Sequence, residues 1–100
     1  MKIICILPVH NESETLARTT ESVVRWIRMR LSEHECLTVI SENGSSDDTA
    51  NITRRLAASL PSVRSISSTA PGKGGAIKRA ATAFEADIFI AMDCDLSTGF

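Results

Sequence analysis

Two aspartates, Asp93 and Asp95, directly follow an apolar run, IFIAM at residues 88–92. In an extended chain, side chains two residues apart point to the same side at a spacing of about 7 Å. Both carboxylates would therefore face one pocket, where they repel each other unless a proton or a cation lies between them. Hard carboxylate oxygens suit Mg²⁺ or Mn²⁺, so the pair is a candidate metal site. A helix cap or a solvated turn after the strand is the alternative.

A glycine-rich stretch is a candidate anion site. In APGKGGAIKRA, residues 70–80, three glycines surround Lys73 just before a predicted helix, whose first N–H groups can receive an anion. The stretch is not a Walker A loop, since no glycine stands five residues before Gly72 and no Ser or Thr follows Lys73. It does not match the dinucleotide fingerprint either, because PVHNE after the first strand lacks glycine. A flexible turn is the alternative.

Two further loops carry polar residues that could contact a ligand. ENGSSDD, residues 42–48, puts Glu42 at the end of a predicted strand, where a carboxylate can accept a hydrogen bond from a ribose hydroxyl or a base. Asn43 and Gly44 are also a common turn dipeptide, so an ordinary turn stays open. In PVHNE, residues 8–12, His10 and Glu12 are candidates for ligand contact, with an ordinary loop as the alternative.

The elements that must position these residues alternate between short apolar runs and longer amphipathic ones, which indicates an α/β fold. The predicted strands are residues 2–7, 36–41, 63–67 and 88–92. The predicted helices run from about 12 to 31, from a cap at Ser45 or Ser46 to Leu60, and from APGKGG to Phe84. Asn11 and Glu14 have the spacing of a capping box, and Pro8 is expected to end the first strand.

Right-handed crossovers between these elements predict a parallel sheet of order 3-2-1-4 with helices on both faces. Residues 88–92 are apolar throughout and are expected to be covered on both faces, whereas residues 63–67 are expected to be peripheral. Ligands of such sheets bind beyond the carboxyl ends of the strands, near the point where the strand order reverses. The loops PVHNE, ENGSSDD and DCDLS meet there.

Composition excludes several classes of function. The chain has 100 residues, with 11 basic and 12 acidic side chains and a formal charge of -1, so no electrostatic footprint indicates nucleic acid or an anionic membrane. The three cysteines are odd in number, and two lie in apolar runs, which favours a reducing cytoplasm. The apolar run before Pro8 is shorter than a signal-peptide core of roughly 7–15 residues, and no run approaches the ~18 of a membrane span.

Four motifs occur together in this chain: ILPVHNESETL, VISENGSSDDTANI, PGKGGAIKRA and IAMDCDLS. In order and spacing they resemble the family 2 glycosyltransferases with the GT-A fold, most like the dolichyl- or polyprenyl-phosphate sugar transferases, over essentially the whole chain. The resemblance implies inverting transfer of a sugar from a UDP- or GDP-linked donor to a lipid phosphate or another glycan. It also implies assistance by Mg²⁺ or Mn²⁺.

The resemblance assigns roles by position. The residues that would contact the donor are Pro8, His10, Glu12, Glu42, Lys73 and Asp93. Asp95 would be the direct metal ligand beside the diphosphate, with Asp93 approaching the ribose or the metal. The chain departs from the family in having Glu42-Asn43 in place of two aspartates, His10 in place of a frequent Tyr, and Ser97 in place of a frequent Gln. The donor is therefore not named.

The resemblance also places these 100 residues as the N-terminal, nucleotide-sugar-binding part of a single, longer GT-A domain, with the catalytic base beyond residue 100. We expect a cytoplasmic location, or the cytoplasmic face of a membrane for a longer protein. A chain that ended here would expose the apolar edge of residues 88–92, which predicts a homodimer or poor solubility unless further residues cover it.

Two other readings remain. Haloacid dehalogenase-like phosphatases also have Asp-x-Asp after an apolar strand, but normally after the first core strand, whereas here the motif follows the fourth. A nucleotide-binding or assembly module without transfer activity is the second.

Overall fold

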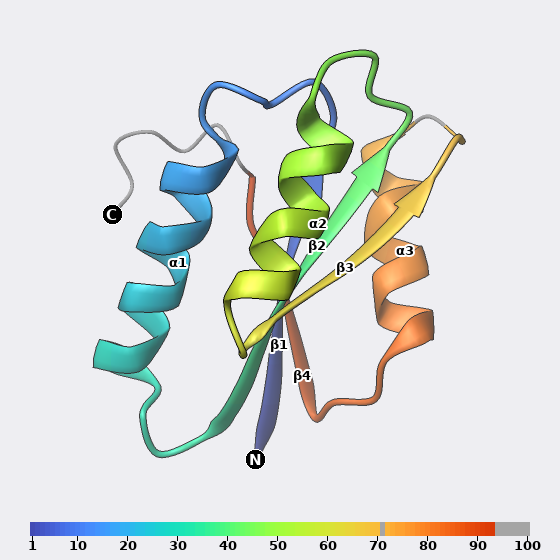
Figure 1. The fold of residues 1–100 in the computed structure, drawn as a ribbon. Helices are drawn as coiled ribbons and strands as arrows, with labels where there is room; N and C mark the ends of the chain where they lie inside the picture. Colours follow the sequence, from blue (N-terminus) through green and yellow to red (C-terminus); the bar gives the residue numbers. More distant parts are fainter. Residues whose placement is uncertain (71, 94–100) are drawn as a thin grey trace.

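The computed structural model describes residues 1–70 and 72–93. It contains one parallel sheet in the predicted order, β3-β2-β1-β4. The strands are β1 (Lys2–Val9), β2 (Glu35–Asn43), β3 (Val63–Ser68) and β4 (Ile88–Ala91). The crossover helices are α1 (Leu16–Arg30), α2 (Thr49–Ser59) and α3 (Lys73–Ala83). Figure 1 shows α1 and α2 on one face of the sheet and α3 on the other, as predicted.

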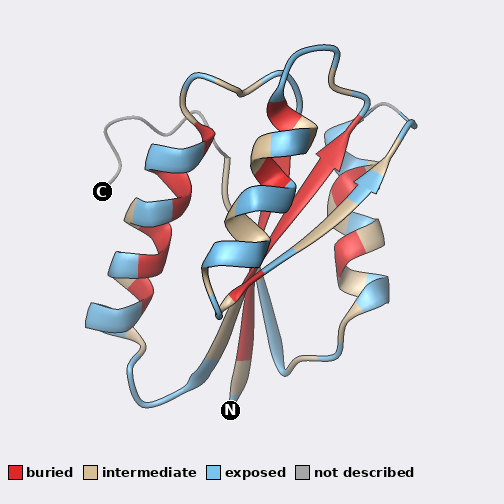
Figure 2. Cartoon of the chain, in the orientation of Figure 1, coloured by how far each residue is buried: buried red, intermediate tan, exposed pale blue. Residues whose placement is uncertain are grey.

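The core is centred on β1, which lies between β2 and β4. The side chains from Ile4 to Leu7 are 0% exposed and alternate between two clusters. Cys5 and Leu7 pack under α1 and α2, while Ile4 and Ile6 pack under α3. Because a parallel strand with helices on both faces has no solvated side, its sequence shows a continuous apolar run rather than an alternating pattern. Figure 2 shows this buried strand at the centre of the fold.

The first strand does not end at Pro8, as the sequence had suggested, but continues to Val9. The β1–β2 register includes Pro8 opposite Ser41. The carbonyl of Ile6 accepts a hydrogen bond from the N–H of Met92. The backbone N–H and C=O groups of every second residue of β1, including position 8, therefore point toward β4. In the described residues, the β1–β4 pairing ends with Ile6 opposite Ala91. The N–H that Pro8 lacks would point to this side of β1 and not to β2, so its absence removes no hydrogen bond between β1 and β2.

The start of the first helix was also predicted wrongly. Helix α1 begins at Leu16, not near residue 12, and its N-cap is Thr15, with no side-chain cap bond. Asn11 has a φ of 53°, a left-handed conformation that a helix start does not allow and that Asn tolerates better than most residues. The predicted capping box is therefore absent, and the Asn11 side chain is used elsewhere. Likewise, the N-cap of α2 is Asp48 rather than Ser45 or Ser46.

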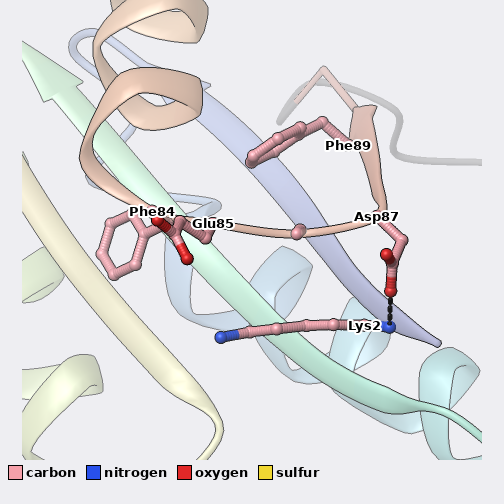
Figure 3. Close-up of a pocket in the computed structure, with 6 residues that line it drawn as sticks. Lys2, Phe84, Glu85, Asp87 and Phe89 are labelled. Carbon is pink, nitrogen blue, oxygen red and sulfur yellow. Dashed lines mark hydrogen bonds between the residues drawn. The ribbon is translucent and has the colours of Figure 1, made fainter.

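Among the described residues, the fourth strand is not covered on both faces, contrary to the prediction. Ile88 and Phe89 are 40% and 37% exposed, because β4 forms one edge of the sheet in the described part of the chain. β3 forms the other edge, as predicted. Beside β4, a cavity of about 570 Å³ is bordered by Lys2, Phe84, Glu85, Ala86, Asp87 and Phe89. Figure 3 shows it at the start of β1 and β4, away from the carboxyl ends of the strands, where the Lys2 N–H donates to Asp87.

Within residues 1–70 and 72–93, no helix is both long enough and apolar enough to cross a membrane.

Candidate functional site

A cavity of about 290 Å³ lies at the carboxyl ends of β1 and β2, beside the start of α3. Small-molecule sites commonly begin near 300 Å³, so the cavity matches the lower end of that range. It lies at the sheet edge where the sequence predicted a ligand site. Three predicted residues line it together with two that were not predicted; the five are Pro8, His10, Asn43, Gly72 and Lys73.

His10 is held in one orientation by the end of β2. Its Nδ1 lies 2.7 Å from the backbone oxygen of Asn43, and a carbonyl can only accept, so Nδ1 carries the proton. In the neutral ring Nε2 is then an acceptor, and Asn11 Nδ2 lies 3.4 Å from it. The imidazole is therefore a fixed wall of the cavity with a defined tautomer.

Asn43 is a site residue that the sequence did not single out. It is 3% exposed, and its Nδ2 donates to the oxygen of Gly72 at 3.3 Å, while its own backbone oxygen accepts from His10. Gly72 has a φ of 106°, a conformation that L side chains rarely adopt. Asn43 thus joins the loop after β1 to the turn before α3. The available signal was its place at the end of a buried strand, where a polar side chain needs a partner.

Glu42 supports the adjacent turn rather than the described cavity wall. The residue is 4% exposed, and its Oε2 accepts a hydrogen bond of 2.7 Å from the N–H of Ser45. This is the turn role that the sequence left open. Glu12 contributes its backbone: its N–H donates to Thr49 Oγ1 at 2.8 Å. Neither residue is among those that line the cavity in the described structure, and their predicted contacts with a donor stay predictions.

Lys73 and Asp93 form an ion pair at the mouth of the site. Lys73 is the first residue of α3, and Asp93 lies two residues after β4, so the fold brings together two predicted site residues that are 20 positions apart. Their side chains are 60% and 45% exposed, and solvated pairs of this kind contribute only about 0–1 kcal/mol. A ligand that offers either group a better partner can therefore displace the pair at little cost.

The described residues satisfy only part of the predicted metal site. Asp93 offers hard oxygen ligands at the cavity mouth, while Asp95 lies outside the described residues. No group of three metal-ligating side chains occurs in residues 1–70 and 72–93. Mg²⁺ is usually held by one or two carboxylates together with substrate phosphates rather than by a protein cage. Asp93 alone offers few of the oxygens that such an ion needs, so a ligand would have to supply others.

Asp47 lies in the loop between β2 and α2. Its Oδ1 accepts hydrogen bonds from the hydroxyl and the N–H of Thr49, and its Oδ2 lies 3.4 Å from the N–H of Ser13. The hydroxyl of Thr49 is the largest cause that lowers the pKa of Asp47 from 3.8 to about 2, against an opposing effect of burial. The ionised carboxylate is thus the form that the folded loop stabilises.

This pKa predicts a pH-dependent contribution to stability. The contribution is complete above pH 3.8 and is lost as the pH falls through about 2, because the folded state holds its proton less tightly than the unfolded chain. We expect Asp47→Asn to lower the thermal midpoint at pH 6, with a smaller difference from wild type at pH 2. Glu33→Gln serves as the control, because Glu33 is exposed and has no ion pair in the described structure. A difference that stays constant from pH 6 to pH 2 would refute the assignment.

Comparison with known proteins adds a family and a fold. Residues 4–98 match the model of glycosyl transferase family 2. The chain is 31% identical over 99 residues to the glycosyltransferase AglD of Haloferax volcanii, covering 98% of this chain but only 16% of AglD. It also superposes on a mannosyltransferase of Pyrobaculum calidifontis, solved with GDP-Man and Mn²⁺, with a TM-score of 0.76 and 21% identity. That match covers 93% of this chain and 27% of the mannosyltransferase, and it confirms the predicted fold.

Proposed function

This chain belongs to glycosyl transferase family 2, and on that premise we propose that it forms the donor-binding part of an enzyme that transfers a sugar from a nucleoside diphosphate sugar. The observation that carries the proposal is the cavity at the carboxyl edge of the sheet. There, a histidine of fixed tautomer, a helix N-terminus, and a displaceable Lys73–Asp93 pair meet. Such a site has a flat wall, anion-binding groups and a carboxylate.

Each part of the cavity suits one part of a donor. Pro8 and His10 form a wall against which a nucleoside can lie, and Asn43 holds that wall in place. The N–H groups at the start of α3 and the ammonium of Lys73 suit a diphosphate, because helix N-termini and cations both favour negative charge. We propose that the diphosphate displaces Asp93 from Lys73.

We propose that Asp93 and Asp95 hold a Mg²⁺ or Mn²⁺ ion beside the diphosphate. Such an ion, when bound, neutralises the charge that a departing diphosphate gains. The ammonium of Lys73, which pairs with Asp93 in the free protein, attracts the same charge. Mn²⁺ and GDP-Man in the Pyrobaculum structure support a divalent ion and make a GDP-linked donor a natural first test.

The proposal extends to the whole reaction by family membership. We propose an inverting transfer to a lipid phosphate or a glycan, with the base that accepts the acceptor's proton supplied from outside residues 1–100. The location proposed for this activity is the cytoplasm or the cytoplasmic face of a membrane. The chain spans 16% of AglD and 27% of the mannosyltransferase, so these remain proposals about the complete enzyme.

The test is calorimetric titration of the chain with GDP and with UDP, each with and without Mn²⁺, repeated with Asp95→Ala. We expect one nucleotide to bind in a metal-dependent way and Asp95→Ala to abolish the metal dependence. Glu33→Ala, which removes an exposed carboxylate remote in sequence from the four motifs, is expected to leave binding unchanged.

If neither nucleotide binds wild-type protein shown to be folded by circular dichroism, the proposed donor site is wrong. Nucleotide binding without any turnover of a GDP- or UDP-linked sugar by a longer protein would instead favour the non-catalytic module.

A further inference from the structure

We propose that Asn11 is a positioning residue for the donor cavity: its side chain fastens the loop after β1 to the loop after β2 and so sets His10 and Asn43 in place. The inference rests on the proposed function, since it concerns the cavity that would take the nucleotide. Asn11 was expected to cap α1. The structure instead turns it, through a φ of 53°, toward a loop more than 30 residues away in the sequence.

The contacts of Asn11 cross between the loops in both directions. Its Oδ1 accepts a hydrogen bond of 2.8 Å from the N–H of Ser46 and lies 3.4 Å from both the hydroxyl of Ser46 and the N–H of Asp47. Its backbone N–H donates to Ser45 Oγ at 3.0 Å. One residue of the first loop thus contacts three consecutive residues of the second. We call this set of contacts the Asn11 latch.

The Asn11 latch lies where the sheet stops holding these segments together. The β1–β2 pairing ends with Val9 opposite Glu42, so beyond that point no ladder pair joins the chain after β1 to the chain after β2 in the described structure, although Asn43 still pairs with Ser68 of β3. Two more bonds continue the connection, from the N–H of Glu12 to Thr49 Oγ1 and from the N–H of Ser13 to Asp47 Oδ2. Side-chain oxygens therefore replace the ladder in satisfying the backbone of both loops.

The Asn11 latch is coupled to the cavity on both sides. His10 directly precedes Asn11, and Asn43 is two residues before Ser45. The two wall residues are joined by the bond from His10 Nδ1 to the Asn43 oxygen. If the loops separate, this bond lengthens, and His10 loses the partner that fixes its tautomer. Displacements of about 1 Å in groups that hold a substrate can cost on the order of 100-fold in function.

A purely structural role for Asn11, as a residue that tolerates a left-handed turn, makes a different prediction. In that case only the backbone conformation matters, and glycine is a full replacement. If the Asn11 latch positions the cavity, the Oδ1 acceptor matters as well. Asn11→Gly and Asn11→Asp both allow this conformation, and both remove the Nδ2 that lies 3.4 Å from His10 Nε2, but only Asn11→Asp keeps an acceptor for the Asn11 latch.

The experiment compares Asn11→Gly, Asn11→Asp and a stability control, Ala58→Gly, on the exposed side of α2. The first readout is the Kd for GDP and UDP with Mn²⁺. We expect Asn11→Gly to weaken binding at least about tenfold, and Asn11→Asp to stay within about threefold of wild type. Ala58→Gly destabilises α2 because glycine loses more backbone entropy on folding than alanine does. It is expected to leave the Kd unchanged.

The second readout does not need nucleotide binding. ¹⁵N NMR of the histidine rings reports the tautomer of His10, and the chain has only two histidines to assign. We expect a single Nδ1–H tautomer in the wild type and a mixture of tautomers in Asn11→Gly. If Asn11→Gly does not fold, Ser45→Ala removes only the acceptor of the Asn11 N–H, and the same mixing is expected there.

These readouts separate the two hypotheses. An unchanged His10 tautomer in Asn11→Gly, or in Ser45→Ala if Asn11→Gly does not fold, would overturn the positioning role, as would unchanged affinity in Asn11→Gly when the wild type binds nucleotide. If the wild type binds neither GDP nor UDP, the proposed function fails, and the tautomer alone decides whether Asn11 positions His10.

Discussion

Ile4→Ala is expected to lower the free energy of unfolding by about 3 kcal/mol, within the 2–5 kcal/mol typical of such truncations in cores. Ile4 is 0% exposed, lies in the central strand β1, and packs with Ile6 and Val39 against Ala80 of α3. The loss combines the transfer free energy of the removed methyl and methylene groups with a cavity that strands hydrogen-bonded on both sides cannot close. A domain of this size has only about 5–15 kcal/mol in total.

Urea unfolding followed by circular dichroism measures this effect as a lower midpoint with an unchanged slope. Met29→Ala is the control, since Met29 is 73% exposed on α1 and its truncation is expected to change stability by less than about 0.5 kcal/mol. Equal effects of the two variants would mean that the layer between β1 and α3 is not packed as described. Ile4 lies toward the start of β1, away from the candidate site, so the test concerns the fold alone.

Lys73→Ala is expected to weaken the binding of a nucleoside diphosphate by about 10- to 100-fold, since a hydrogen bond to a charged group contributes about 1.5–3 kcal/mol. Lys73 lines the cavity at the start of α3, and its partner in the free protein, Asp93, is solvated enough to be displaced. Because the interaction joins opposite charges, the wild-type affinity should also fall more steeply with added salt than that of the variant.

Lys78→Ala provides the matched control on the same helix, because Lys78 is exposed and does not line this cavity. Lys73→Ala frees Asp93 and could change the affinity for metal. The titrations are therefore made at saturating Mn²⁺, so that only the affinity for nucleotide is compared. Lys73→Arg retains the charge and is expected to recover part of the affinity. Equal affinities for wild type and Lys73→Ala would remove Lys73 from the proposed diphosphate site.

The pattern of apolar residues was sufficient to predict the elements and their order. A strand covered on both faces must be apolar at every position, and a helix on a sheet must be apolar at helical spacing, so each signal lies within one segment. The handedness of the crossovers then leaves few topologies, which explains why the order 3-2-1-4 and the helices on both faces were predicted correctly. The same reasoning located the cavity, because parallel strands bring their carboxyl ends to one edge.

The loops could not be predicted in the same way. Local rules assigned Asn11 to a helix cap and Asn43 to a turn, yet both are bonded to residues about 30 positions away. Pro8 was expected to end a strand, and it does not, because its missing N–H would face the β4 side of β1, where the described residues form no ladder pair at that position. In each case, the deciding contact comes from another loop or strand, which the local sequence does not encode.

The residue types in this chain were enough to predict an α/β sheet with a polar edge where the loops after the first, second and fourth strands meet, and the family resemblance added Lys73 to that prediction. How that edge is assembled depended on the tertiary structure: which oxygen fixes the tautomer of His10, which side chain faces the cavity, and which strand remains exposed. The physical reason is that apolar burial follows a short-range periodicity, whereas backbone groups beyond the ends of the strands must find hydrogen-bond partners wherever the fold places them.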